Sequence, residues 1–229
     1  MGTRLRVSGL MLVAGLAVLC RVQALATSAL LCVVLFLSVL LHELVHVWLS
    51  HRRLVSCPER ILWPLGGLFG SAPRRPDIVV NLAGPAVSLI LALAAASQLD
   101  FQSEILPLIN PMTCWQAIQS HNMLTKLLRI GFFVNTLIVA ANLIPVRPMT
   151  AGYVLQSVLV RRYSEMESRD LLLRMGLVIG ILGLLGGFVL DLSGLAAFSA
   201  FLLLLHVQEV VQLFHLPVGY GTGSNSAGF

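Results

Sequence analysis

The amino-acid sequence predicts an all-α membrane protein, a polytopic bundle of about six transmembrane helices, each of which needs about 20 apolar residues. Hydrophobic residues make up 57% of the 229 residues and charged residues only 11%, whereas soluble domains average roughly 25% charged residues. The apolar residues gather in long runs, and basic residues flank those runs. These observations together exclude a soluble domain of ordinary composition.

The expected spans follow one another along the chain. The N-terminal stretch resembles a signal peptide, but it lacks a clear small-residue cleavage site, so we expect an uncleaved first span. We expect residues 1–215 to form a single domain and the Gly- and Ser-rich residues 216–229 to form a disordered tail. The predicted spans lie near residues 7–25, 27–50, 78–98, 129–146, 171–190 and 194–214.

The connector between the second and third spans, residues 51–77, mixes Pro and Gly with apolar residues such as Ile61 and Trp63. This mixture predicts a short re-entrant or hairpin connector at the membrane interface, where irregular backbone must be covered by protein or line a cavity. The connector formed by residues 99–128 is mildly amphipathic, and we expect it on the outer surface.

The basic residues are distributed unevenly between the two sides of the membrane. If the six spans alternate, one side receives two arginines at the N-terminus and five in each of two connectors, whereas the other side receives three basic residues. The positive-inside rule then places both termini in the cytoplasm. The net charge of +5 is explained by this topology, so we predict the lipid bilayer as a partner and no nucleic acid.

A His-Glu-Leu-Val-His motif occupies residues 42–46, within the second span. His42 and His46 are spaced i, i+4, so on a helix their imidazoles share one face and can bind one zinc ion (Zn2+). The Glu43 carboxylate can reach a metal-bound water as general base and then pass the proton to the leaving amine. Ionisable groups at membrane depth are costly and usually mark function. The motif therefore predicts two zinc ligands and a catalytic glutamate.

Three further motifs follow in order. They are Leu65-Gly66-Gly67, Ala83-Gly84-Pro85-Ala86 and Asn142-Leu143-Ile144-Pro145-Val146-Arg147-Pro148-Met149. With the histidine motif they resemble the site-2 protease family of intramembrane zinc metalloproteases, over roughly residues 28–160. The resemblance implies a compact bacterial-type member in the cytoplasmic membrane, which cleaves a membrane-spanning protein substrate near the cytoplasmic face.

The sequence departs from the family pattern at one position. In the family, an Asp that follows Pro-Leu supplies the third zinc ligand, and here Pro148-Met149 is followed by Thr150. Thr150 is the candidate third-ligand position, directly or through a bridging water, although a hydroxyl is a poorer zinc ligand than a carboxylate. His206 and Glu209 in the sixth span are alternative ligands, or simply a polar patch at a helix end.

The resemblance also implies that Asn142 helps to hold the substrate backbone; the alternative is a helix–helix hydrogen bond worth about 1 kcal/mol. The function that these residues predict is an intramembrane zinc metalloendopeptidase. The alternative, which Thr150 favours, is a catalytically inactive pseudoprotease that binds transmembrane segments. A proton-coupled transporter has less support, because Glu209 is the one acidic residue in the other predicted spans.

Overall fold

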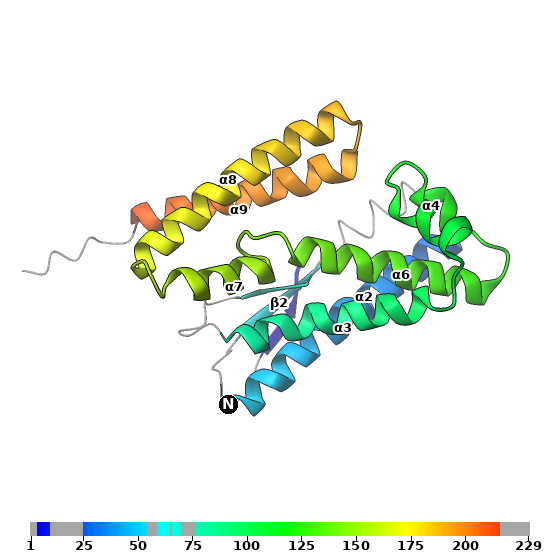
Figure 1. The fold of residues 1–229 in the computed structure, drawn as a ribbon, viewed down its shortest axis with the longest axis horizontal. Helices are drawn as coiled ribbons and strands as arrows, with labels where there is room; N and C mark the ends of the chain where they lie inside the picture. Colours follow the sequence, from blue (N-terminus) through cyan, green and yellow to red (C-terminus); the bar gives the residue numbers. More distant parts are fainter. Residues whose placement is uncertain (1–3, 10–24, 55–58, 65, 70–76, 216–229) are drawn as a thin grey trace, which may run out of the picture. The chain divides into compact units, whose positions relative to one another are not determined.

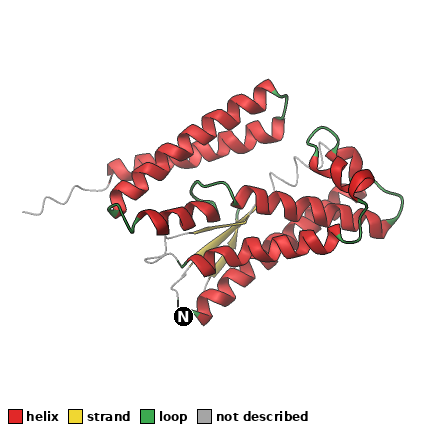
Figure 2. Cartoon of the chain, viewed as in Figure 1, coloured by secondary structure: helices red, strands yellow, loops and turns green. Residues whose placement is uncertain are grey.

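The computed structural model describes residues 4–9, 25–54, 59–64, 66–69 and 77–215. Helices dominate the described residues (Figures 1 and 2). Four of them are long and apolar enough to cross a membrane, and they correspond to the predicted second to fifth spans. These four are α2 (Leu25–Arg52), α3 (Ile78–Ala96), α6 (Met123–Asn142) and α8 (Glu165–Val189). Helix α9 (Ser193–His215) covers the predicted sixth span and carries a shorter apolar segment, Ser193–Val207.

A small sheet accompanies these helices, which the helical prediction did not include. Strand β1 (Arg4–Val7) pairs in parallel with β2 (Glu59–Trp63), and β2 pairs antiparallel with β3 (Gly66–Phe69). Arg4 lies opposite Glu59, so the two strands come from distant parts of the chain. The predicted first span begins at Val7, the end of β1, and its residues 10–24 lie outside the described residues.

The chain forms two compact units, residues 1–172 and 173–229. In the first unit, α3 packs against α2, α6 and the short helix α7 (Thr150–Leu159), and α2 also packs against α6 and β3. Side chains such as Val39, Ile130 and Ile138 are fully buried between these helices. The face on which α2 and α3 meet is therefore buried inside this unit.

The start of α3 is fixed by a side-chain cap. The Asp77 carboxylate accepts hydrogen bonds from the backbone N–H groups of Val79 (2.8 Å) and Val80 (3.1 Å), which would otherwise lack helical partners. Arg53, just beyond the end of α2, lies 3.5 Å from the same carboxylate. The end of α2 and the beginning of α3 are thus joined across the connector.

Short helices connect α3 to α6. They are η1 (Phe101–Ile105), α4 (Leu106–Ile109) and α5 (Cys114–Ala117). Arg129 of α6 holds this connector: it donates to the Glu104 carboxylate (2.8 Å) and to the carbonyls of Ala117 and Gln119. The backbone N–H of Asp100 and the Arg129 side chain both hydrogen-bond the Glu104 carboxylate, and they lower its pKa.

The second unit begins within α8 and contains α9, and glycines of α8 let the two helices approach closely (Figure 1). An added Cβ would meet Leu203 at Gly180, Ser199 at Gly183 and Ala196 at Gly187. Because each of these glycines faces a residue of α9, this face of α8 is a close-packing surface.

Candidate metal centre

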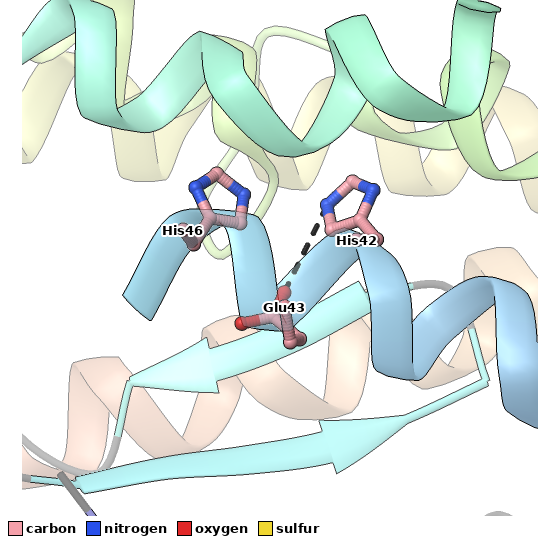
Figure 3. A group of neighbouring side chains, drawn as sticks. All are labelled: His42, Glu43 and His46. Atoms are coloured by element: carbon pink, nitrogen blue, oxygen red, sulfur yellow. Dashed lines mark ion pairs between the residues drawn. The ribbon is translucent and has the colours of Figure 1, made fainter. Parts of the chain in front are cut away.

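Three buried side chains of α2 form the candidate metal centre. His42, Glu43 and His46 are 1%, 1% and 4% exposed, and one ligand atom from each lies within 4.8 Å of the others. His42 Nε2 lies 3.8 Å from Glu43 Oε1. Figure 3 shows both imidazoles on the side of α2 that faces α3, with the Glu43 carboxylate turned toward them. The helix thus gathers the three predicted residues into one group.

The His46 ring is oriented by α3. Its Nδ1 lies 2.7 Å from the backbone carbonyl oxygen of Val80. A carbonyl can only accept, so Nδ1 carries the proton and donates it, and the lone pair lies on Nε2. A metal-ligating histidine usually donates such a hydrogen bond from its other ring nitrogen, because the bond fixes both the ring and its tautomer.

The His42 ring is also held by α3, but through a hydroxyl. Its Nδ1 lies 3.0 Å from Ser88 Oγ, and Ser88 is fully buried. A serine hydroxyl can donate or accept, so it is compatible with the tautomer in which Nδ1 donates and Nε2 carries the lone pair. In that tautomer the two Nε2 atoms are free of protons, as zinc ligands must be, and the Glu43 carboxylate lies beside them.

Sequence reasoning missed both groups of α3 that hold the imidazoles. Val80 acts through a backbone carbonyl, which leaves no trace in the residue type. Ser88 left a weak signal, since it is a polar residue within an apolar span, at a spacing of eight residues from Val80. That spacing places both on one face of a helix, but only the packing of α3 on α2 shows that the face meets the histidines.

Thr150 and Asn142 lie together. Thr150 begins α7, is 8% exposed, and donates its hydroxyl proton to Asn142 Oδ1 at 3.0 Å. The Asn142 amide donates to the carbonyl of Ile138 at 2.9 Å. Between them, the chain turns through Arg147, whose guanidinium lies 5.3 Å from the centre of the Tyr153 ring. The two predicted residues therefore form a hydrogen-bonded pair in the same unit as the histidines.

The other two candidate ligands belong to α9 in the second unit. His206 is 1% exposed, and its Nδ1 lies 2.7 Å from the Leu202 carbonyl, one turn earlier in the same helix. The Glu209 side chain lies outside the described residues. Among the described His, Cys, Asp and Glu side chains, the group that can hold a metal ion consists of His42, Glu43 and His46.

Comparison with known sequences decides the family. Residues 30–183 match the sequence profile of Peptidase family M50. This chain belongs to Peptidase family M50. A zinc metalloprotease of Methanocaldococcus jannaschii is 28% identical over 166 residues, which cover 70% of this chain and 43% of that protein. Rip3 of Mycobacterium tuberculosis, named as a candidate zinc metalloprotease, is 30% identical over 173 residues, covering 73% of this chain and 39% of that protein.

This M50 chain therefore spans about two-fifths of the length of these curated relatives. Its fold is similar to the solved structure of the Site-2 Protease from Methanocaldococcus jannaschii, with a TM-score of 0.61, 24% identity and 91% of each chain covered. The family assignment confirms the resemblance to site-2 proteases. Together with the four apolar helices, it makes the chain an integral membrane protein. The comparisons do not favour the pseudoprotease alternative.

Proposed function

We propose that this M50 chain is an intramembrane zinc metalloendopeptidase, which cleaves a membrane-spanning protein substrate near the cytoplasmic face. The observation that carries the proposal is the buried group of His42, Glu43 and His46, whose ligand atoms lie within 4.8 Å of one another. The names of the M50 relatives, which describe zinc metalloproteases, support zinc as the metal.

The three side chains take separate roles in this proposal. His42 and His46 hold the ion through Nε2. Bound zinc supplies Lewis acidity, which polarises the scissile carbonyl and makes water more acidic. Glu43 accepts the proton of the attacking water and delivers it to the leaving amine. The distance of 3.8 Å between Glu43 Oε1 and His42 Nε2 supports this role.

Thr150, which is hydrogen-bonded to Asn142, lies at the sequence position where the family pattern has its acidic ligand. We propose that Thr150 occupies the third-ligand position with a weaker oxygen donor, and that Asn142 binds the backbone of the unwound substrate. A helical substrate must unwind because its peptide carbonyls are otherwise hydrogen-bonded within the helix. The hydrogen bond from Thr150 to Asn142 Oδ1 supports the proposal, since it fixes the amide at the end of α6.

The proposed surroundings are a bacterial cytoplasmic membrane, with six spans and both termini in the cytoplasm. The charge asymmetry supports this orientation. Helices α2, α3, α6 and α8, which are long and apolar enough to cross a membrane, support four of the six spans, and we propose that α9 forms another.

Zinc analysis and a cleavage assay test the proposal with the purified full chain in detergent. The substrate probe is an engineered single-span reporter protein with a helix-breaking Gly-Pro pair in its span. We expect about one zinc per chain and cleavage by the parent. Glu43→Gln keeps the zinc and loses about 10²- to 10⁴-fold in cleavage rate, the usual contribution of a general base.

Three results would contradict the proposal or part of it. A parent without zinc lacks the centre altogether. A parent that binds zinc but is inert, and that gains cleavage through Thr150→Asp, is a pseudoprotease. Equal cleavage by the parent and by Glu43→Gln would remove Glu43 from its proposed role.

A further inference from the structure

Three residues of α3 face the histidines of α2, at spacings of four. Val80 contacts His46 through its carbonyl, Ser88 contacts His42 through its hydroxyl, and Gly84 lies between them on the same face. The pairing of the later residue of α3 with the earlier histidine shows that the two helices run antiparallel here. Gly84 therefore lies opposite the interval between the two imidazoles.

Gly84 touches the ring atoms that would bind the metal. A Cβ added at this position would overlap Nε2 of both His42 and His46. The backbone is ordinary helix, so conformational freedom does not explain the glycine, which normally weakens a helix interior. What the position requires is empty space beside the two nitrogens.

Another glycine of the same unit shows that this requirement is specific. Gly131 lies within α6, in a membrane-spanning helix like Gly84, and an added Cβ there meets nothing within 4 Å. A methyl group at Gly131 is therefore tolerated, whereas at Gly84 it enters the metal centre.

We infer that Gly84 and Ser88 are positioning residues of the zinc centre, an inference that rests on the proposed function. Gly84 keeps the space in which the two Nε2 atoms converge. Ser88 holds the His42 ring by Nδ1, as the Val80 carbonyl holds the His46 ring. A side chain introduced at position 84 meets the ends of two rotatable side chains, the rings of His42 and His46. We therefore expect the rings to move and the backbone to keep its place. The metal centre is therefore affected more than the fold.

The test measures zinc affinity by competition with a chelator, on the full chain in detergent. Gly84→Ala is expected to lower the affinity about 100-fold or more, and Ser88→Ala about 10- to 100-fold, as for other outer-shell contacts. Gly131→Ala is the matched control for the first variant. Ser157→Ala is the control for the second, because Ser157 is a buried serine that bonds only the Tyr153 carbonyl of its own helix in the described contacts.

Two further readouts separate positioning from a general loss of structure. The visible absorption of the cobalt-substituted chain is expected to change in Ser88→Ala and to stay as in the parent in Ser157→Ala. The metal-free Gly84→Ala chain is expected to keep a cooperative thermal unfolding transition, as the Gly131→Ala chain does, even if the overlap lowers its midpoint.

The outcomes distinguish this inference from the proposed function. If the parent binds zinc, and Gly84→Ala and Ser88→Ala bind it equally well, the inference is wrong and the proposed centre stands. If the parent binds no zinc, both are wrong. If Gly84→Ala does not fold, Ser88→Ala decides, because it removes a single oxygen atom and adds no volume.

Discussion

Two helix pairs of this molecule each bring a glycine against a buried histidine. They differ in the group to which the histidine Nδ1 is hydrogen-bonded. In α2 and α3, Gly84 lies against His42 and His46, whose Nδ1 atoms are bonded to the neighbouring helix. In α8 and α9, Gly176 lies against His206, whose Nδ1 is bonded to a carbonyl of its own helix. In the described residues, His206 Nε2 has no hydrogen-bond partner.

This difference shows that a contact between a glycine and a histidine does not by itself indicate a metal site. Gly176 begins a series that continues with three more glycines of α8, each against a residue of α9, so its contact belongs to close helix packing. Gly84 is the one glycine of α3, and it faces two imidazoles with a carboxylate nearby. Converging donors, held from a second helix, are what distinguish the α2–α3 pair.

The largest effect is expected from removing one histidine of the α2–α3 pair and comparing it with removal of His206. His46→Ala is expected to lower zinc affinity about 1000-fold or more, since it leaves one imidazole in a site that needs three protein ligands. Cleavage of the reporter is expected to fall below detection. Chelator competition measures the first effect, and His206→Leu is the matched control. If His206→Leu lost zinc to the same extent, His206 would be a ligand and the comparison would fail.

Alanine at Gly176, in the α8–α9 pair, should affect stability instead of metal binding. A Cβ at Gly176 overlaps the His206 ring, and overpacking of this kind costs about 1 to 3 kcal/mol. We expect Gly176→Ala to lower the free energy of unfolding by this amount and to leave zinc affinity unchanged. Unfolding in mixed detergent, followed by far-UV circular dichroism, measures the loss. A drop in zinc affinity would link the second unit to the centre.

A substitution at Thr150 tests whether this position reaches the metal. Thr150→Asp restores the carboxylate of the family pattern, and we expect zinc affinity to rise about tenfold, which is about 1.4 kcal/mol. The change also removes the hydroxyl that donates to Asn142. Thr150→Ala removes the same bond without adding a ligand, so it is the matched control. Unchanged affinity in Thr150→Asp would show that this position does not reach the metal.

The smallest effect is expected at His206 itself. A buried acceptor without a partner is unfavourable, and apolar replacements at such positions are often neutral or stabilising. We therefore expect His206→Leu to change the free energy of unfolding by less than about 1 kcal/mol. The same denaturation experiment measures it. A large destabilisation would mean that the imidazole makes an essential polar contact.

The second to fifth spans were predictable from the sequence because burial in lipid demands long apolar runs. The second span, expected near 27–50, is α2 (Leu25–Arg52), and the third, expected near 78–98, is α3 (Ile78–Ala96). The fourth, expected near 129–146, is shifted toward the N-terminus as α6 (Met123–Asn142). Hydropathy misplaced it because the Asn122 side chain caps the helix earlier, and apolar residues continue beyond its end at Asn142.

Parts that depend on distant residues could not be predicted in this way. Strand β1 acquires its partner, β2, from a segment more than fifty residues later in the chain. In the candidate centre, the motif itself identified His42, Glu43 and His46. The groups that orient the rings lie on α3 and required the packing of two helices to be known. The catalytic role of Glu43 and the third-ligand position at Thr150 stay predictions.

The hydrogen bonds from α3 to the histidines also have a consequence for biosynthesis. Ser88 lies 46 residues after His42, and the Val80 carbonyl lies 34 residues after His46. When α2 enters the membrane, the complete motif is present, but the two groups of α3 that hold its imidazoles follow later in the chain. These two hydrogen bonds therefore form only after α3 has inserted beside α2.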